Sequence, residues 1–298
     1  MAKTYLYSEI FHSIQGEGNY TGYPTAWFRF FLCNLQCNGF GQKDPTDPST
    51  YFLPYEDVNV EDYNTMEELP VFEFGCDSSY SWAKKFKSLT RKGTAEQIAN
   101  SIRDHMKCSS NPKGYFNFSD TKQHMCFTGG EPLMKHAQPA IKEIMSEFYK
   151  QQDYPRFMTF ETNGTQELSE EFKSFLEDYQ YEGGGEVFFS VSPKTWNVAG
   201  EKAEKAIKPE IIAEYAQFGP GQLKFVCNGR EEAWDEIEDL IKQYREVGVK
   251  YPVWIMPVGA TVEGQKLVDG DVAQQAFKRG YNVSARVHTY LWGNVIGV

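Results

Sequence analysis

Apolar positions along the chain follow two alternating periods from residue 94 onward. Stretches with apolar residues three or four apart, typical of helices, alternate with short continuous apolar runs, typical of buried strands. The pattern predicts helices at 94–106, 137–150, 168–179, 208–218, 231–248 and 272–280. It predicts strands at 124–130, 156–164, 186–194, 222–229, 251–259 and 281–288. The first helix also begins with a capping-box signal, Thr94 followed by Gln97.

This alternation predicts an α/β fold in which crossover helices connect parallel strands, in a sheet that is open or curled into a barrel. Ligands of such folds bind beyond the carboxyl ends of the strands. Four stretches with unusual residues directly follow predicted strands: TGGEP, ETNGT, SPK and MPVG. We expect these stretches to line one rim of the sheet.

Residues 38–75 differ from the rest of the chain. They contain nine acidic residues against one lysine, carry four prolines and show no sustained period. We interpret them as an insertion on the surface, called the acidic insert below, within a single domain that spans 1–298.

Composition narrows the function classes. The 298 residues are 41% hydrophobic, which suits a globular protein, and the net charge of −11 argues against a general nucleic-acid-binding surface. The first ten residues contain no apolar signal region, and no run approaches the roughly 18 apolar residues of a membrane span. We therefore expect a soluble, cytoplasmic protein that binds no membrane and no nucleic acid directly.

Cys33 and Cys37 are the first candidate ligands of a metal group. A third cysteine near Phe40 is absent, but Cys76 follows the acidic insert directly. Three thiolates can hold a [4Fe–4S] cluster with one iron open to another ligand, and loop length adds little to closure entropy. Two unrelated thiols, or two ligands of a zinc site, explain an isolated C-x₃-C equally well.

Three further motifs offer polar groups, and each has a structural explanation as well. FTGGEP at 127–132 lets backbone approach a ligand closely, or forms an ordinary strand-to-helix turn. SEIFHSIQGEG at 8–18 presents Gln15 and Glu17 between glycines. Arg29 lies in an apolar strand and requires an acidic partner, such as a ligand carboxylate or a salt bridge. His288 opens the apolar tail HTYLWGNVIGV, where a packed histidine is favoured over a catalytic one.

Together these motifs resemble those of the radical S-adenosylmethionine (SAM) enzymes and, within them, the 7-carboxy-7-deazaguanine synthases. The matched stretches are SEIFHSIQGEG, the three cysteines with Asp77 and Ser78, TGGEP, ETNGT, SPK and the closing HTYLWGNVIGV. They extend from residue 8 to the last residue. The departure is the third cysteine, which the family normally places three residues after the second.

The resemblance implies a partial, shortened TIM-like barrel, a homodimer and a flavodoxin- or ferredoxin-type electron donor. It implies that a [4Fe–4S] cluster and SAM convert 6-carboxy-5,6,7,8-tetrahydropterin to 7-carboxy-7-deazaguanine with loss of ammonia, a step of queuosine-type nucleoside biosynthesis. It also implies Mg²⁺, which helps to organise the substrate.

The resemblance further assigns roles to individual residues. Cys33, Cys37 and Cys76 would ligate the cluster, and Ser78 would ligate Mg²⁺. The residues assigned to SAM are Gly130, Glu131, Ser192, Pro193 and Lys194. Those assigned to the pterin are Ile14, Gln15, Gly16, Arg29, Thr128 and Val298. No side chain is assigned as a catalytic acid or base.

Two alternatives remain at this point. An activase that installs a glycyl radical on a partner protein would share the cysteines and GGEP, although it has no reason to keep SIQGEG or the LWGN tail. A zinc-binding or non-catalytic metal-binding α/β protein would explain why Phe40 replaces a cysteine.

Overall fold

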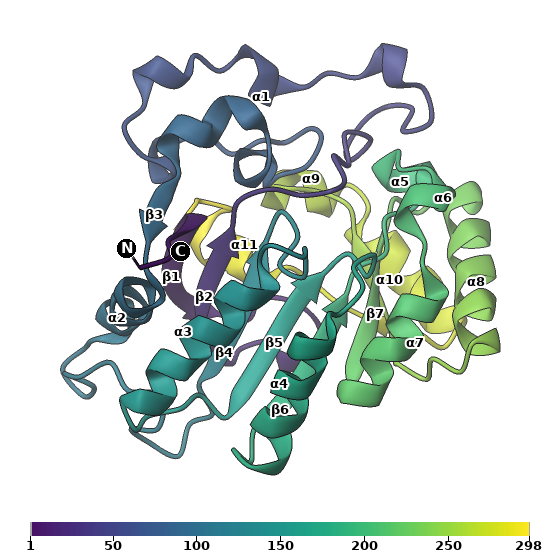
Figure 1. Cartoon of the computed structure of the whole chain (residues 1–298). Coiled ribbons are helices and arrows are strands. Elements are labelled where there is room, and N and C mark those ends of the chain that lie inside the picture. Colours follow the sequence, from purple (N-terminus) through teal and green to yellow (C-terminus); the bar gives the residue numbers. More distant parts are fainter. Residues whose placement is uncertain (1, 298) are drawn as a thin grey trace.

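A computed structural model describes residues 2–297, which form one mixed sheet with helices packed against it (Figure 1). Within these residues the sheet has nine strands. They are β1 (Tyr5–Ile14), β2 (Pro24–Phe30), β3 (Arg91–Gly93), β4 (His124–Gly129), β5 (Phe157–Thr162), β6 (Glu186–Val191), β7 (Gly221–Cys227), β8 (Val253–Pro257) and β9 (Asn282–Val283).

The strand order is β3-β1-β2-β4-β5-β6-β7-β8-β9. From β2 to β9 every neighbouring pair is parallel, whereas β1 is antiparallel to both β2 and β3. The predicted α/β fold with a mostly parallel sheet is therefore confirmed. The sheet is not closed, because β3 and β9 are its two edges.

Within the described residues, six helices of ten or more residues follow the strands, as the sequence predicts. They are α2 (Ala95–Met106), α3 (Gln138–Lys150), α4 (Glu170–Tyr181), α7 (Pro209–Phe218), α8 (Glu231–Glu246) and α10 (Asp269–Lys278). The predicted capping box is present, since the Thr94 hydroxyl accepts from Gln97 N and the Gln97 side chain accepts from Thr94 N. Shorter helices are α1 (Pro54–Asp57), α5 (Trp196–Ala199), α6 (Ala203–Ala206), α9 (Val262–Lys266) and α11 (Val287–Trp292).

The prediction of a strand at 281–288 is wrong over most of its length. Only Asn282 and Val283 pair with β8, and α11 begins at Val287. Ser284 N still donates to Ile255 O of β8, but its hydroxyl accepts from Gly18 N, and Val287 N donates to Gly16 O, so the chain turns from β8 to the segment after β1.

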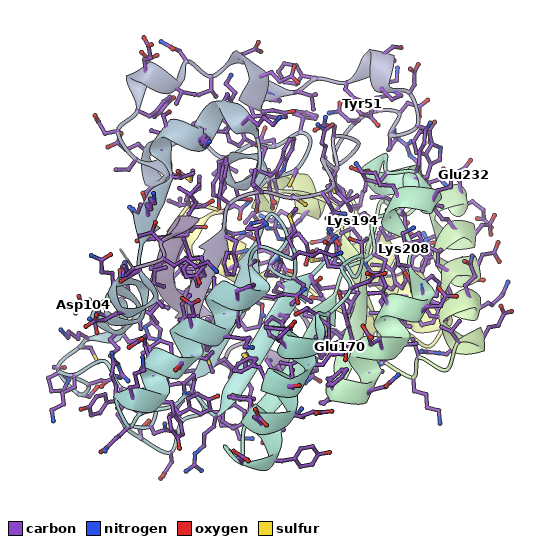
Figure 2. The ribbon with its side chains drawn as sticks, in the orientation of Figure 1. Tyr51, Asp104, Glu170, Lys194, Lys208 and Glu232 are labelled. Atoms are coloured by element: carbon purple, nitrogen blue, oxygen red, sulfur yellow. The ribbon has the colours of Figure 1, made fainter. Side chains whose placement is uncertain are left out.

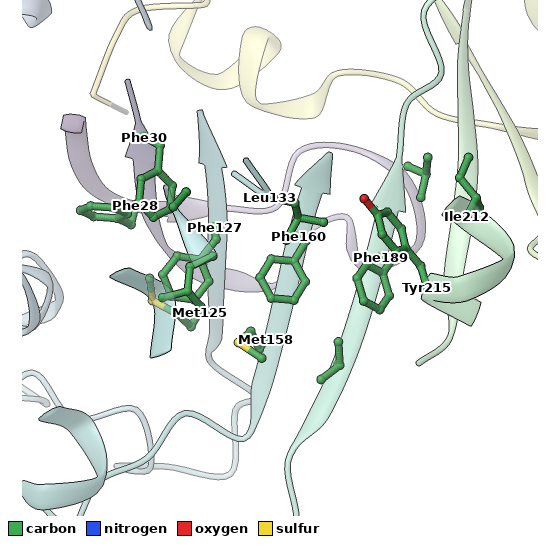
Figure 3. Packing of buried hydrophobic residues seen from close by; sticks show 14 of the residues in the cluster. Phe28, Phe30, Met125, Phe127, Leu133, Met158, Phe160, Phe189, Ile212 and Tyr215 are labelled. Atoms are coloured by element: carbon green, nitrogen blue, oxygen red, sulfur yellow. The ribbon is translucent and has the colours of Figure 1, made fainter. Parts of the chain in front are cut away.

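The two faces of the sheet carry different side chains, as the pleat of a strand requires. Phe28, Phe127, Phe160 and Phe189 stand in register on four neighbouring strands (Figure 3). They belong to the main core, which also holds buried side chains of the helices. One residue further along, the other face presents Arg29 paired with Thr128, and Glu161 paired with Ser190. Because successive side chains point to opposite faces, this row of polar side chains faces away from the main core.

The open sheet is strongly curved. Seven strand spacings of about 4.8 Å separate β1 from β9, which would be about 34 Å in a flat sheet. Yet Gly18 N, four residues after β1, donates to Ser284 Oγ, directly after β9, at 2.8 Å. Val287 N also donates to Gly16 O at 2.9 Å. The segments that follow the two distant strands therefore meet over the polar face.

The acidic insert holds α1 and several short 3-10 turns. It is more than a surface excursion, because Tyr55, Met66, Leu69 and Phe72 are buried. They form a second apolar cluster, called the insert core here, which consists of Phe31, Tyr55, Met66, Leu69, Phe72, Tyr80, Ala83, Phe86 and Ile296. Within residues 2–297, no helix is long and apolar enough to cross a membrane.

Candidate functional site

A cavity of about 290 Å³ opens over the polar face of the sheet. All four stretches expected at one rim contribute to its lining, which confirms that expectation: Thr128, Gly129 and Gly130; Glu161, Thr162 and Asn163; Ser192 and Lys194; Pro257, Val258 and Gly259. Lys194 lies near the middle of the molecule, below the insert that carries Tyr51 (Figure 2).

Cys33, Cys37 and Cys76 line the same cavity, although 38 residues lie between the second and the third. The base of the insert is closed by a hydrogen bond from Gly75 N to Phe40 O at 2.8 Å. Because Gly75 precedes Cys76, residues 41–74 of the insert loop out from this hydrogen bond, and Cys76 returns to the place that the chain left at Phe40. Phe40 packs with Cys33, Cys37 and Cys76 in one small apolar cluster.

The loop that carries Cys33 and Cys37 is held from outside by Glu201, which sequence reasoning missed. One oxygen of this buried carboxylate accepts from Gln36 N at 2.6 Å and from Cys37 N at 2.8 Å. Cys37 has a φ of 54°, a left-handed conformation that side chains other than glycine rarely adopt. The two hydrogen bonds therefore stabilise an otherwise unfavourable backbone at a candidate ligand.

Burial dominates the acid–base state of the three thiols. It raises the pKa of Cys33 to about 12, and it also raises the pKa of Cys37 and Cys76. The ammonium group of Lys194 opposes this rise at all three thiols. Neutral thiols are thus favoured in the protein alone, and a bound cation that replaces the protons would reverse this preference.

The glycines of TGGEP allow two backbone segments of this chain to approach each other closely. A Cβ at Gly129 would overlap the Phe30 backbone, and one at Gly130 would overlap the Leu32 carbonyl next to Cys33. Glu131 is fully buried and does not line the cavity. Its oxygens accept from Leu133 N, Thr162 Oγ1 and Asn163 N at 2.7–2.9 Å. It therefore ties β4 to β5, while burial raises its pKa to about 7.

The remaining residues assigned to SAM and Mg²⁺ lie at or beside the cavity. Lys194 Nζ donates to Ser192 Oγ at 2.8 Å, and both residues line the cavity, whereas Pro193 between them is buried. Ser78 also lines the cavity, and its hydroxyl donates to Asp77 Oδ1 at 3.2 Å.

Most of the residues assigned to the pterin also line the cavity. Arg29 and Thr128 are neighbours on β2 and β4, and Ile14, Gln15 and Gly16 follow one another at the end of β1. All five line the cavity. Val298, the sixth, lies outside the described residues.

Arg29 has an internal acidic partner as well as a cavity-facing position. Its Nε pairs with Glu9 Oε1, which also accepts from Tyr80 Oη at 2.8 Å. The salt bridge considered from the sequence is therefore present. Because Arg29 also borders the cavity, its guanidinium can contact a ligand carboxylate from the other side.

Five charged side chains form a chain across the cavity, called the charge network here: Glu161, Lys224, Glu17, Arg286 and Asp77. Lys224 Nζ is 2.5 Å from Glu17 and 3.0 Å from Glu161, and Arg286 lies 3.0 Å from Glu17 and 2.7 Å from Asp77. Sequence reasoning named Glu17 and Asp77 but assigned no role to any of the five. Lys224 had the same signal as Arg29, a charge within an apolar strand.

These pairs decide the charge states. Burial disfavours ionised Glu17, but Lys224 and Arg286 outweigh burial and hold its pKa below the usual range. Lys224 likewise keeps a raised pKa, because Glu161 and Glu17 outweigh the effect of its burial. His288 differs: burial and then Arg286 lower its pKa to about 4, so it is neutral at pH 7. The cavity wall is thus ionised and ordered, with one neutral imidazole.

Comparisons with known proteins place these features in context. No protein-family model matches the chain. The curated 7-carboxy-7-deazaguanine synthase of Pyrobaculum aerophilum is 22% identical over 296 residues, which cover 97% of this chain and 95% of that protein. The 7-carboxy-7-deazaguanine synthase of Rickettsia prowazekii is 24% identical over 95% of this chain and 86% of its own length.

The chain is similar to 7-carboxy-7-deazaguanine synthases over nearly its whole length. The resemblance predicted from the motifs is therefore confirmed by synthases of several organisms. Among solved structures, a crystal structure of QueE from Escherichia coli matches with a TM-score of 0.48 and 17% identity, over 96% of this chain and 95% of that chain.

Proposed function

We propose that this protein is a radical SAM enzyme that converts 6-carboxy-5,6,7,8-tetrahydropterin to 7-carboxy-7-deazaguanine and releases ammonia. The observation that carries the proposal is the return of Cys76, through the Phe40–Gly75 hydrogen bond, to the cavity that Cys33 and Cys37 line. The similarity to 7-carboxy-7-deazaguanine synthases over nearly the whole chain supports the choice of reaction.

Cys33, Cys37 and Cys76 would hold a [4Fe–4S] cluster. The donor set fits this group, since three thiols share an apolar corner and Lys194 supplies a positive charge near all of them. Within residues 2–297, no three His, Cys, Asp or Glu side chains are grouped to hold a single metal ion. When bound, the cluster and SAM would supply one-electron cleavage of SAM and a radical that abstracts hydrogen.

The chain's own residues would then bind and orient both small molecules. Gly130, Ser192 and Lys194 would contact SAM on the side of the cysteines. Pro193 and Glu131, which do not line the cavity, would support these contacts from behind, Glu131 through a carboxylate ordered by three hydrogen bonds. Ser78, beside the Asp77 carboxylate, would offer oxygen to Mg²⁺, a cation that prefers such ligands.

The pterin would occupy the side lined by Ile14, Gln15, Gly16, Arg29 and Thr128, closed by Val298. Arg29 would pair with its carboxylate, a planar group that suits a guanidinium. Gln15 is fixed for recognition, since its Nε2 donates to Glu161 at 3.0 Å and its Oε1 accepts from Glu17 N. The charge network would hold this wall rigid and exclude water.

The assembly and its surroundings are part of the same proposal. The chain would fold as one domain over 1–298, with its curved, open sheet as a shortened barrel of the radical SAM type. It would act in the cytoplasm as a homodimer and receive electrons from a flavodoxin- or ferredoxin-type donor. The Gly18–Ser284 contact between the segments after β1 and β9 supports the barrel-like curvature.

The test is anaerobic reconstitution with iron and sulfide, followed by SAM, reductant, Mg²⁺ and 6-carboxy-5,6,7,8-tetrahydropterin. We expect cluster absorbance and 7-carboxy-7-deazaguanine. Cys76→Ala should lose both, whereas Cys108→Ala, which changes an exposed cysteine outside the cavity, should keep both.

Each other outcome has a defined meaning. A full, active cluster in Cys76→Ala would show that the third ligand is misassigned. A cluster without deazapurine product would favour a different radical SAM activity, such as glycyl-radical activation. No cluster at all would favour a non-catalytic metal-binding protein.

A further inference from the structure

The acidic insert and the C-terminal tail meet on the cavity side of the molecule. Ile296 is the one residue of the insert core that comes from the tail, and only 8% of its surface is exposed. The insert contributes Met66 and Phe72, each about 1% exposed, to the same cluster. Ile296 is therefore buried against a segment that lies more than two hundred residues earlier.

The contact continues beyond Ile296. A Cβ placed on Gly297 would lie 3.2 Å from Glu67 Cγ, so the backbone of the tail passes directly over the insert. Glu67 is itself fixed, because its carboxylate pairs with Arg91 of β3 at 2.7 Å. The part of the insert under the tail is thus fastened to the edge of the sheet.

Both segments also form part of the cavity wall. Val71 and Glu73 of the insert line it, and so do Val295, Ile296 and Gly297 of the tail. Before this stretch, Asn294 Nδ2 donates to Asp77 Oδ2 at 3.4 Å, which joins the tail to the charge network. Ile14, at the end of β1, and Gln15 and Gly16, which follow it, line the same cavity.

We infer that the acidic insert is a positioning element for the C-terminal tail: the insert core anchors Ile296 and thereby builds the wall of the cavity that the tail forms. This assigns the insert a role that its acidic composition does not suggest. Apolar side chains on the buried side of the insert anchor the tail, and charged side chains on its outer side remain in contact with water. Met66 and Phe72 are positioning residues that act through the tail.

The primary test is hydrogen exchange, measured by mass spectrometry on the reconstituted protein. Met66→Ala should increase exchange of the amides in 293–297 by about tenfold or more, because the anchor for Ile296 is weakened. Ile296→Ala should in turn increase exchange within 64–72. Changing the tail residue cannot unfold the main core, so this second variant stays informative if Met66→Ala folds poorly.

Met145→Ala is the matched control, because Met145 is equally buried but packs in the main core on α3. We expect it to lower the melting temperature without changing exchange of the tail. The inference would be overturned if the tail amides of Met66→Ala exchanged at the wild-type rate. It would also be overturned if Met145→Ala increased the exchange of those amides as much as Met66→Ala does.

A second readout rests on the proposed function. Met66→Ala should raise KM for the carboxy-tetrahydropterin by about tenfold, with a much smaller change in kcat, because the wall is loosened and the cluster ligands are untouched. If wild-type protein forms no deazapurine, the proposed function fails while the exchange result still decides the role of the insert. Faster exchange in the tail of Met66→Ala with an unchanged KM would show that the insert orders the tail. It would contradict the inference that the ordered tail forms part of the wall that binds the substrate.

Discussion

At the residue scale, the site depends on charges that compensate one another. In the charge network each cation lies between two carboxylates: Lys224 between Glu17 and Glu161, and Arg286 between Glu17 and Asp77. Lys224 is only 3% exposed. Removing one member of such a network leaves a buried charge without a partner. The resulting loss of unfolding free energy is larger than the net stabilisation that an intact buried pair provides.

Lys224→Met should therefore destabilise the protein by about 3–5 kcal/mol at pH 7.5 and strongly reduce turnover. The loss should become smaller at pH 5.5, because burial raises the pKa of Glu17 once Lys224 no longer opposes it. Urea unfolding at both pH values checks this. Lys173→Met removes a lysine that also pairs with two glutamates, but on the surface, and should remain close to wild type. Equal effects of the two substitutions would contradict the prediction.

His124 provides a separate test of pH dependence. It is 3% exposed at the start of β4, where its ring stacks on Phe157 and contacts the tilted ring of Tyr20, and burial lowers its pKa to about 4. Because the folded pKa lies below the unfolded value of about 6.5, the unfolded state binds the proton more readily. Stability is therefore fully present above pH 6.5 and is lost as the pH falls toward 4.

Between pH 7.5 and 5.5, this histidine should account for about 1.4 kcal/mol of lost unfolding free energy. His124→Phe, which preserves the aromatic packing, should lose that part of the dependence. His105→Phe, at an exposed position on α2, should keep the wild-type slope. Parallel stability–pH curves for wild type and His124→Phe would show that His124 does not titrate in this range.

At the scale of the elements, the segment after α5 supports the loop that carries two candidate cluster ligands. Glu201→Ala removes the acceptor for Gln36 N and Cys37 N and should lower the iron and sulfide retained per chain after reconstitution. Glu201→Gln should largely restore retention, since one side-chain oxygen accepts both hydrogen bonds. Glu204→Ala, an exposed neighbour on α6, should behave as wild type. Unchanged iron content in Glu201→Ala would contradict this positioning role.

The elements also show what sequence reasoning can and cannot supply. Periodicity predicted the six long helices and the parallel sheet. The spacing of apolar residues in each segment reflects which of its side chains pack against the neighbouring layer. The strand predicted at 281–288 was wrong over most of its length, since the chain turns from β8 after Ser284 to contact Gly16 and Gly18, which follow β1. Glu201 and Arg286 carried no periodic signal. Their partners come from distant segments, which a single sequence does not pair.

At the scale of the whole molecule, function depends on the curvature that brings the segments after β1 and β9 together. The seam between them is small: Gly18 N to Ser284 Oγ, Val287 N to Gly16 O, and Arg286 to Glu17. Gly16 and Glu17 border the cavity on one side of this seam, and Arg286 and His288 border it on the other. The shape of the cavity is therefore set by a contact that no single element provides.

Ser284→Ala tests this dependence. It leaves the buried Gly18 N–H without its acceptor, which should lower the unfolding free energy by about 1–3 kcal/mol and raise KM for the pterin. Ser169→Ala is the matched control, because that hydroxyl also accepts one backbone N–H, from Phe172, but it caps α4 on the outer layer. The control should lose about 1 kcal/mol of stability and keep the wild-type KM. If both variants raised KM in proportion to their loss of stability, the effect would reflect general loosening, and the seam would have no specific part in shaping the site.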